Sequence, residues 1–469
     1  MKALLFLLLT TLTALADLPV SGRPVSNLAG LDTIMLDEMA DSTATAGVLG
    51  VIHNGRIVYL RSFGYDFGQA PIPENALFRI ASLCKPVTAA AIRQLANSGA
   101  FGGQGLQRRV FNLTIDGINN NGLLTVTPFL IQGVNVLGDI RFADITVEHL
   151  LHHAGGFRRN QGPGDPMFKA RQIADEMGVA SPPSRHNIMR WMLGRPLIWA
   201  PGTVDLGDNE DAYSNFGYMV LGEIVAAYSP DGSYLAHLRS RTLTPSMWVP
   251  EGEYRQGRSL LIDRHGREPA YNGGDAVTSV FDDFPFPVSE PYGGWNLEAM
   301  LAHGGLIASA ATMLEFGSRY EVWYPDIGTA SPSNGGSHTG ALTGTSSVLW
   351  RRNDTANTVV YAAFNVRNND NGEHLAGEVR SRVATYMNGS ITWPTGTCDG
   401  FWVSAGSGTS GTVGRGGYHD SYRGFAKAWN ETTEGSRIRL KPGNNGWSGT
   451  LNRRMRLDAP EGAARIGVQ

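Results

Sequence analysis

The spacing of apolar and polar positions changes along the chain and predicts both strands and helices. Two apolar stretches, 48–53 and 56–63, flank an Asn-Gly pair at 54–55, and Asn-Gly between such stretches is a strong signal for an antiparallel hairpin. Strand character returns at 346–351 and 358–366. We therefore expect strands from both ends of the sequence to form the sheet.

Helical patterns dominate the region between these strands. An alanine-rich helix is expected to begin near Ser82 and end near Gly99, because Pro86 is tolerated only in a first helical turn. Residues 145–240 are mostly helical in pattern, with loops rich in Pro and Gly. The sequence therefore predicts an α+β fold, an antiparallel sheet flanked by helices with an inserted, mostly helical domain. A cleft between the two parts is the expected site.

Composition divides the chain further. Residues 1–16 have the charged start, apolar core and small-residue end of a secretory signal peptide, which predicts a secreted or periplasmic protein. Residues 17–394 form the expected principal domain, residues 395–417 a linker rich in Gly, Ser and Thr, and residues 418–469 a small β-rich C-terminal segment. No later stretch resembles a transmembrane helix, so no integral membrane segment is expected once the signal is removed.

Charge and cysteine content exclude several classes of protein. The formal net charge is −3 and 17% of the residues are charged, which gives no electrostatic case for a nucleic-acid partner. The two cysteines, Cys84 and Cys398, cannot form a disulfide framework. The expected partner is a small-molecule or peptide substrate.

Ser82 and Lys85 are the first candidate catalytic residues, since they lie three residues apart at the start of the predicted helix. At that spacing both side chains share one helical face and can exchange a proton. A serine hydroxyl is a poor nucleophile until a neighbouring base takes its proton. The alternative is a capping serine followed by a solvated lysine.

Tyr213 and Asn215 precede a second apolar helical run at 216–225. A tyrosine on such a loop can exchange protons with Ser82, although a phenol of normal pKa needs a cation such as Lys85 nearby to favour its charged form. The Asn215 amide can hold a substrate carbonyl or amide. Alternatively, Asn215 is the N-cap of that helix.

A third candidate segment is His338-Thr339-Gly340, which leads into a predicted strand. His338 and Thr339 offer side-chain donors, and Gly340 permits a substrate backbone to approach closely. A backbone N–H in this segment, together with that of Ser82, can form an oxyanion hole. The alternative is an ordinary turn or strand entry.

The order of these three motifs resembles the serine β-lactamase/penicillin-binding-protein superfamily over roughly residues 30–390. The sequence is most similar to the class C β-lactamase-like branch, with its related esterases and D-peptidases. The resemblance implies a catalytic domain at 17–394 and no cofactor. It also implies that an acyl-enzyme forms on Ser82, that Lys85 and Tyr213 share the proton transfer, and that water hydrolyses the intermediate.

The remaining roles also follow from the resemblance. It implies substrate binding by Asn215, His338, Thr339 and Gly340, with an oxyanion hole formed by the backbone N–H groups of Ser82 and Ala341. Many β-lactamases have Lys where this chain has His338, and a histidine is mostly neutral near pH 7. We therefore expect weaker recognition of a carboxylate and a preference for esters or D-amino-acid amides.

Several alternatives remain open. Within the same superfamily, the chain is a candidate β-lactamase or D-alanyl-D-alanine carboxypeptidase, and a penicillin-binding sensor without turnover is the alternative of a different class. An α/β-hydrolase is disfavoured because the sequence contains no G-x-S-x-G motif. His149, His152 and His153 have helical spacing, but without H-E-x-x-H or a carboxylate partner they form an incomplete metal site, so no metal is expected.

Overall fold

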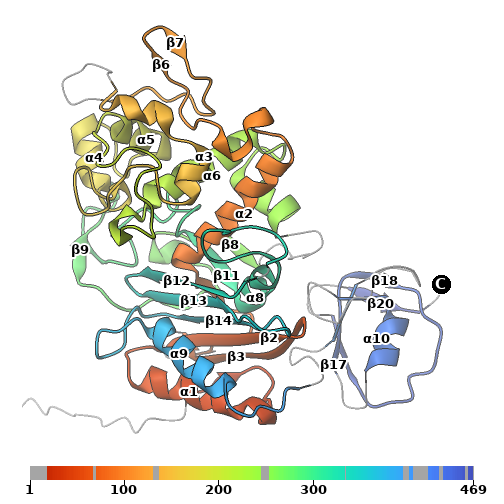
Figure 1. Cartoon of the computed structure of the whole chain (residues 1–469). Helices are drawn as coiled ribbons and strands as arrows, with labels where there is room; N and C mark the ends of the chain where they lie inside the picture. The colour runs from red at the N-terminus through yellow and green to blue at the C-terminus, as the bar shows by residue number, and fades with distance from the viewer. Residues whose placement is uncertain are drawn as a thin grey trace, which may run out of the picture.

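The computed structural model describes most of the chain, and Figure 1 shows a helical region above a sheet with a small C-terminal unit beside it. The described residues are 18–66, 70–129, 137–243, 253–332, 334–394, 401–404, 421–432, 437–459 and 463–467. The predicted signal peptide, 1–16, lies outside them. Among the described residues, no helix has the length and apolar character needed to cross a membrane.

The principal sheet has seven strands, and all of its pairings are antiparallel. The predicted hairpin is confirmed as β2 and β3. Strand β2 also pairs with β14, so strands from both ends of the predicted principal domain meet in one sheet, as expected. The order is β1-β3-β2-β14-β13-β12, with β4 beside β3. The strands are β1 (Val20–Ser21), β2 (Ala46–His53), β3 (Arg56–Asp66), β4 (Ala70–Pro71), β12 (Gly336–Leu342), β13 (Thr345–Arg351) and β14 (Val359–Phe364).

Helices cover both faces of this sheet. Helices α1 (Ala29–Ala40) and α9 (Leu375–Met387) pack on one face, and α8 (Ala310–Arg319) packs on the other. Side chains alternate between the faces because the side-chain period of a strand is two. In β14, one set joins the apolar core beneath α1 and α9, namely Val360, Ala362 and Phe364, and the other set joins the core beneath α8, namely Val359, Tyr361 and Ala363.

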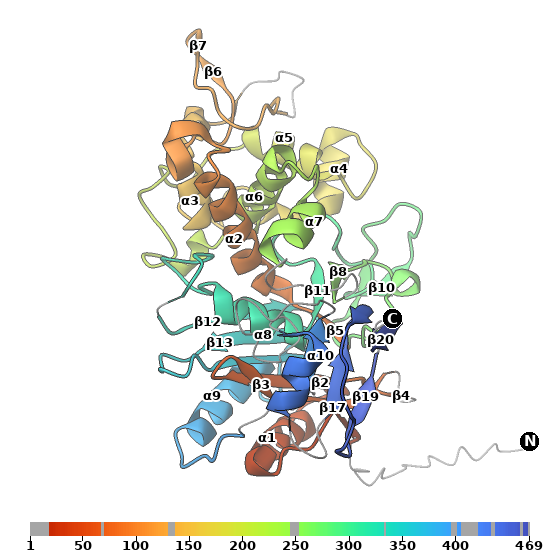
Figure 2. The same ribbon diagram turned by 90° about the vertical axis from the view of Figure 1, so that its right-hand side faces the viewer.

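The helical region lies above the sheet in both views (Figures 1 and 2). Its central pair is α2 and α6, which pack against each other. Its helices are α2 (Cys84–Asn97), α3 (Val147–Leu151), α4 (Ala170–Met177), α5 (Arg185–Leu193), α6 (Asn215–Tyr228) and α7 (Tyr234–His237). Shorter strands complete this part of the chain: β5 (Leu77–Arg79), β6 (Thr114–Ile115), β7 (Ile118–Asn119), β8 (Tyr254–Gln256), β9 (Ala276–Thr278), β10 (Pro287–Ser289) and β11 (Leu306–Ser309). Together these elements are an α+β fold.

The C-terminal segment contains mainly short parallel strands around its own apolar cluster. Its elements are β15 (Phe401–Ser404), β16 (Tyr422–Arg423), α10 (Phe425–Glu431), β17 (Arg437–Leu440), β18 (Gly443–Asn445), β19 (Arg456–Asp458) and β20 (Ala464–Ile466). The linker prediction is therefore wrong at 401–404, where an apolar run pairs with β17. The rest of 395–417 lies outside the described residues. An ion pair of 2.5 Å between Arg439 and Glu74 connects this segment to the larger part.

Candidate active site

Ser82 lies on a short 3₁₀ helix, η2 (Ala81–Leu83), that leads into α2. Ala81 before it has φ +46°, a left-handed conformation uncommon for a residue with a Cβ. The Ser347 hydroxyl on β13 donates a hydrogen bond of 2.9 Å to the Ile80 carbonyl and so fixes the entry to this turn. Ser82 itself is only half-buried. The backbone therefore presents its hydroxyl from a strained, anchored turn of the kind found at functional sites.

Lys85 is fully buried one helical turn after Ser82. Its Nζ lies 3.1 Å from Ser82 Oγ and donates to Asn215 Oδ1 at 2.7 Å and to the His303 carbonyl at 3.1 Å. Burial lowers the pKa of Lys85 to about 7. A substantial fraction of the amine is therefore neutral at neutral pH, as a general base requires.

Tyr213 lies over the same amine, with Lys85 Nζ 4.5 Å from the centre of its ring. Burial raises the pKa of Tyr213, and a hydrogen bond with Ser82 opposes part of that rise. Lys85 therefore lies near the ring as expected, but burial is the largest influence on the pKa of the phenol. The phenol keeps its proton at neutral pH, so Tyr213 is suited to donate a proton and Lys85 to accept one.

His153 supports Tyr213, a function that the sequence did not reveal. The buried imidazole stacks on the Tyr213 ring with centroids 4.6 Å apart. Its Nδ1 accepts a hydrogen bond of 2.9 Å from the Ser214 N–H, and its Nε2 lies 2.6 Å from the Tyr324 hydroxyl. Because a backbone N–H can only donate, the neutral ring has its proton on Nε2. Burial holds the pKa of His153 well below its usual value.

The three histidines do not share one helical face. Helix α3 ends at Leu151, and His153 lies beyond it with φ +59°. The His149 ring accepts the Thr146 N–H in a capping box. Among the residues that the structure describes, no group of three His, Cys, Asp or Glu side chains is placed to hold a metal ion.

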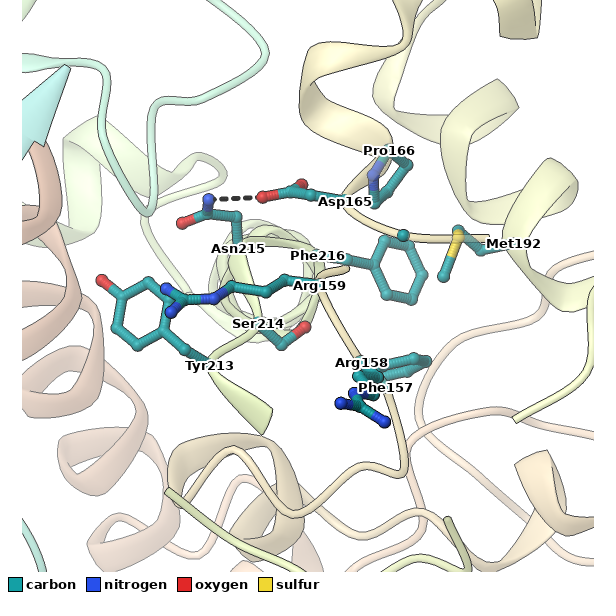
Figure 3. A pocket seen from close by; sticks show the side chains of 11 residues that line it. Phe157, Arg158, Arg159, Asp165, Pro166, Met192, Tyr213, Ser214, Asn215 and Phe216 are labelled. Carbon is teal, nitrogen blue, oxygen red and sulfur yellow. Dashed lines mark hydrogen bonds between the residues drawn. The ribbon is translucent and has the colours of Figure 1, made fainter. Parts of the chain in front are cut away.

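Asn215 is the first residue of α6, and the alternative prediction that it caps this helix is wrong. Ser214 is the N-cap, since its hydroxyl accepts the Gly217 N–H at 2.9 Å. The Asn215 amide is thereby free to bridge two side chains. Its Oδ1 accepts from Lys85, and its Nδ2 donates to Asp165 Oδ2 at 2.7 Å (Figure 3).

The third predicted segment forms β12, at one edge of the principal sheet and beside η2. A Cβ at Gly340 would lie 2.3 Å from the Ile80 carbonyl oxygen and 3.1 Å from the Ser82 nitrogen, so only glycine fits. His338 is buried, and burial lowers its pKa to about 3. Its Nδ1 donates to the Thr339 carbonyl at 2.8 Å. The Thr339 side chain, in contrast, is exposed.

The register of β12 determines which way Ala341 points. Leu342 pairs with Thr345 across the two-residue turn, and Ala341 pairs with Ser346 next to it. The pair that closes such a turn is hydrogen-bonded, and the next pair directs its N–H groups away from the partner strand. The Ala341 N–H therefore points away from β13, toward the free edge of the sheet, and the neighbouring Gly340 lies against Ser82. This geometry is compatible with the predicted oxyanion hole.

A narrow pocket next to Tyr213 and Asn215 contains charged side chains that the sequence motifs did not include (Figure 3). Arg159 is exposed there, and its charge lowers the pKa of Tyr213 slightly against the effect of burial. Asp165 accepts the Asn215 amide on the other side. No spacing relates either residue to the three motifs, because both lie on the loop between α3 and α4.

Comparisons with known proteins support the family resemblance that was drawn from the order of the three motifs. The profile of the beta-lactamase family matches residues 31–428. The esterase EstB of Burkholderia gladioli is 27% identical over 179 residues, which are 37% of this chain; the chain spans only 40% of the length of that esterase.

Two solved structures are similar in fold. A D-stereospecific amidohydrolase from Streptomyces sp. has a TM-score of 0.49 and 16% identity, covering 77% of this chain and 99% of that one. An octameric penicillin-binding protein homologue from Pyrococcus abyssi has a TM-score of 0.48 and 17% identity, covering 77% of each chain.

Proposed function

Because the chain belongs to the beta-lactamase family, we propose that it is a serine hydrolase that works through an acyl-enzyme on Ser82. The observation that carries this proposal is the hydrogen bonding of Lys85. Both of its carbonyl partners, Asn215 Oδ1 and the His303 oxygen, can only accept. The neutral amine satisfies them with its two N–H groups, and its lone pair is left for the Ser82 hydroxyl 3.1 Å away.

The proposed reaction begins with attack of Ser82 Oγ on the acyl carbonyl while its proton passes to Lys85 Nζ. The carbonyl oxygen becomes an oxyanion held by the N–H groups of Ser82 and Ala341, typically a large contribution to such catalysis. Tyr213, still protonated, protonates the leaving group and regains its proton from Lys85. Water then attacks the acyl-enzyme with the same groups, and Ser82 leaves with its proton restored.

For the substrate we propose carboxylic esters or D-amino-acid amides. His338 is neutral and buried, so it supplies no cation for a substrate carboxylate. The similarity to an esterase favours esters. A β-lactamase or D-alanyl-D-alanine carboxypeptidase is the second candidate, favoured by the family match. A secreted or periplasmic location is proposed from the signal-like residues 1–16.

The proposal is tested by comparing wild type with Ser82→Ala on p-nitrophenyl butyrate, D-alanyl p-nitroanilide and nitrocefin. We expect the ester or the D-amide to be hydrolysed fastest, and Ser82→Ala to lose at least about 10⁴-fold in kcat. Ser381→Ala, an exposed serine on α9, is the control. Activity retained in Ser82→Ala contradicts the nucleophile, and fastest turnover of nitrocefin contradicts the substrate class.

Counting turnovers separates an enzyme from a sensor. If the protein stops after one equivalent of product and retains a covalent adduct on Ser82, it is a penicillin-binding sensor and not a hydrolase. We expect many turnovers per molecule, with an acyl adduct that is detected by mass spectrometry only early in the reaction or after rapid acid quenching.

A further inference from the structure

Asp165 is a carboxylate at the active site that the proposed reaction does not yet use. Its Oδ2 accepts from Asn215 Nδ2 at 2.7 Å (Figure 3), and its Oδ1 accepts the Met167 N–H at 3.0 Å. Burial raises the pKa of Asp165 above its usual range, while these two hydrogen bonds favour the ionised form and oppose that rise. An ionised carboxylate can only accept hydrogen bonds.

This acceptor determines which way the Asn215 amide faces. Only the NH₂ group of Asn215 can donate to Asp165, so Oδ1 must face Lys85, where it accepts at 2.7 Å. In the opposite orientation, the NH₂ group would face the lysine amine. The amine would then have to turn its lone pair toward Asn215, away from Ser82, in order to accept that hydrogen bond.

We propose that Asp165 is a positioning residue for acyl transfer: it fixes the amide orientation of Asn215 and thereby keeps the lone pair of Lys85 directed at Ser82. The inference rests on the proposed function of Ser82. Asp165 does not touch the reacting atoms, and it acts through Asn215.

Because Asp165 is charged, this role should also affect the pH dependence of the reaction, besides its rate. The carboxylate favours the protonated form of Lys85, which burial disfavours. Removing the charge therefore lowers the pKa of Lys85 and moves the acid limb of the kcat/KM profile to lower pH. The other titratable groups that face the amine are Cys84, His153, Tyr213, Tyr218, His303 and His338, and the substitution leaves all of them in place.

The test is Asp165→Asn, which keeps the shape but can either accept from or donate to Asn215. With p-nitrophenyl butyrate, or whichever panel substrate the wild type turns over, we expect kcat to fall about 10- to 100-fold. The acid limb should shift to lower pH. Asp165→Ser keeps a side-chain acceptor for the Met167 N–H and serves as a second variant should Asp165→Asn fold poorly.

Asp139→Asn is the matched control. Asp139 caps a 3₁₀ helix as Asp165 does, by accepting the N–H two residues ahead, here that of Arg141 at 2.9 Å. It does not contact Asn215. We expect wild-type kcat and an unshifted profile for this variant, so that a loss specific to Asp165 is separated from the general effect of replacing a capping carboxylate with an amide.

A double-mutant cycle with Asn215→Ala decides whether Asp165 acts through the amide. We expect Asp165→Asn to lower kcat in the wild-type background and to have almost no further effect once Asn215 is removed. The proposal requires this coupling and the downward shift of the acid limb, and failure of either overturns it. Ser82→Ala in the same assay reports separately on the proposed function.

Discussion

The two faces of the principal sheet bury different kinds of side chain. The core beneath α1 and α9 is apolar, and Glu38 at its border is paired with Arg382 at 2.9 Å. The core that joins α8, α2 and α6 instead surrounds buried lysine and histidine side chains, among them Lys85, His153 and His338. Their pKa values are all lowered, first of all by burial.

This difference separates the stability of the fold from its chemistry. Burying an ionisable group without an opposite charge is unfavourable, and shifted pKa values of this kind gather at functional sites. The apolar core beneath α1 and α9 carries no such cost. We infer that this apolar core stabilises the sheet and offsets the unfavourable burial of ionisable catalytic groups on the opposite face.

Of the substitutions that compare the two faces, loss of the base should have the largest effect. Lys85→Met should lower kcat by about 10²- to 10⁴-fold, because general-base assistance disappears. Met fills a similar volume and avoids the cost of burying an amine, so the chain should remain folded. Steady-state kinetics and thermal unfolding followed by circular dichroism measure both quantities. Near-normal kcat in this variant would place the base elsewhere.

The converse substitution is Leu31→Ala on α1, where the side chain is fully buried in the opposite core. The free energy of unfolding should fall by about 2–5 kcal/mol from lost burial and cavity formation. At temperatures where the variant is folded, kcat should be unchanged. Urea unfolding and the ester assay together check this. A drop in kcat without a drop in stability would show that the two faces are not separate.

The pH dependence is the third prediction. Lys85 must be neutral to accept a proton, and burial lowers its pKa to about 7. Below that pH the amine is protonated, so kcat/KM should fall on the acid side and be about tenfold lower at pH 6 than at its plateau. Circular dichroism over the same range verifies that the fold persists. A profile that is flat from pH 5 to 8 would rule out Lys85 as the base.

The smallest effect is expected from removing residues 395–469. The cut leaves Trp393 stacked on His53, with ring centroids 3.9 Å apart. The C-terminal segment has its own apolar cluster, and losing its ion pair with Glu74 is offset because the cut also returns the Glu74 carboxylate to water. We expect kcat/KM within about twofold of wild type and nearly unchanged unfolding of the larger part. A truncated protein that fails to fold would show that the C-terminal segment is part of the folding unit that contains the active site.

The sequence predicted those features that depend on local spacing. The hairpin followed from Asn-Gly between apolar runs, and the proximity of Ser82 to Lys85 followed from three-residue helical spacing. Tyr213 and the β12 segment could be placed only through the motif order of a family. Spacing alone says nothing about contacts between residues 130 apart, such as Lys85 and Asn215.

The features that could not be predicted from the sequence depend on tertiary packing. Asp165 and His153 reach the site through loops whose paths follow no residue period, and the spacing of the three histidines gave no sign of the contact between His153 and Tyr213. Predicting proton donation by Tyr213 required knowledge of its burial, which raises the pKa of the phenol. The apolar run at 401–404 also overrode the linker composition around it.

Cys84, between nucleophile and base in sequence, is buried beneath the active site, and burial raises the pKa of its thiol to about 12. It is therefore kept as an unreactive sulfhydryl, since alkylating agents and oxidants attack the thiolate. In the folded protein, Cys84 should then resist iodoacetamide while fluorophosphonates label Ser82. Burial thus protects the helix that carries Ser82 and Lys85 from oxidation at Cys84.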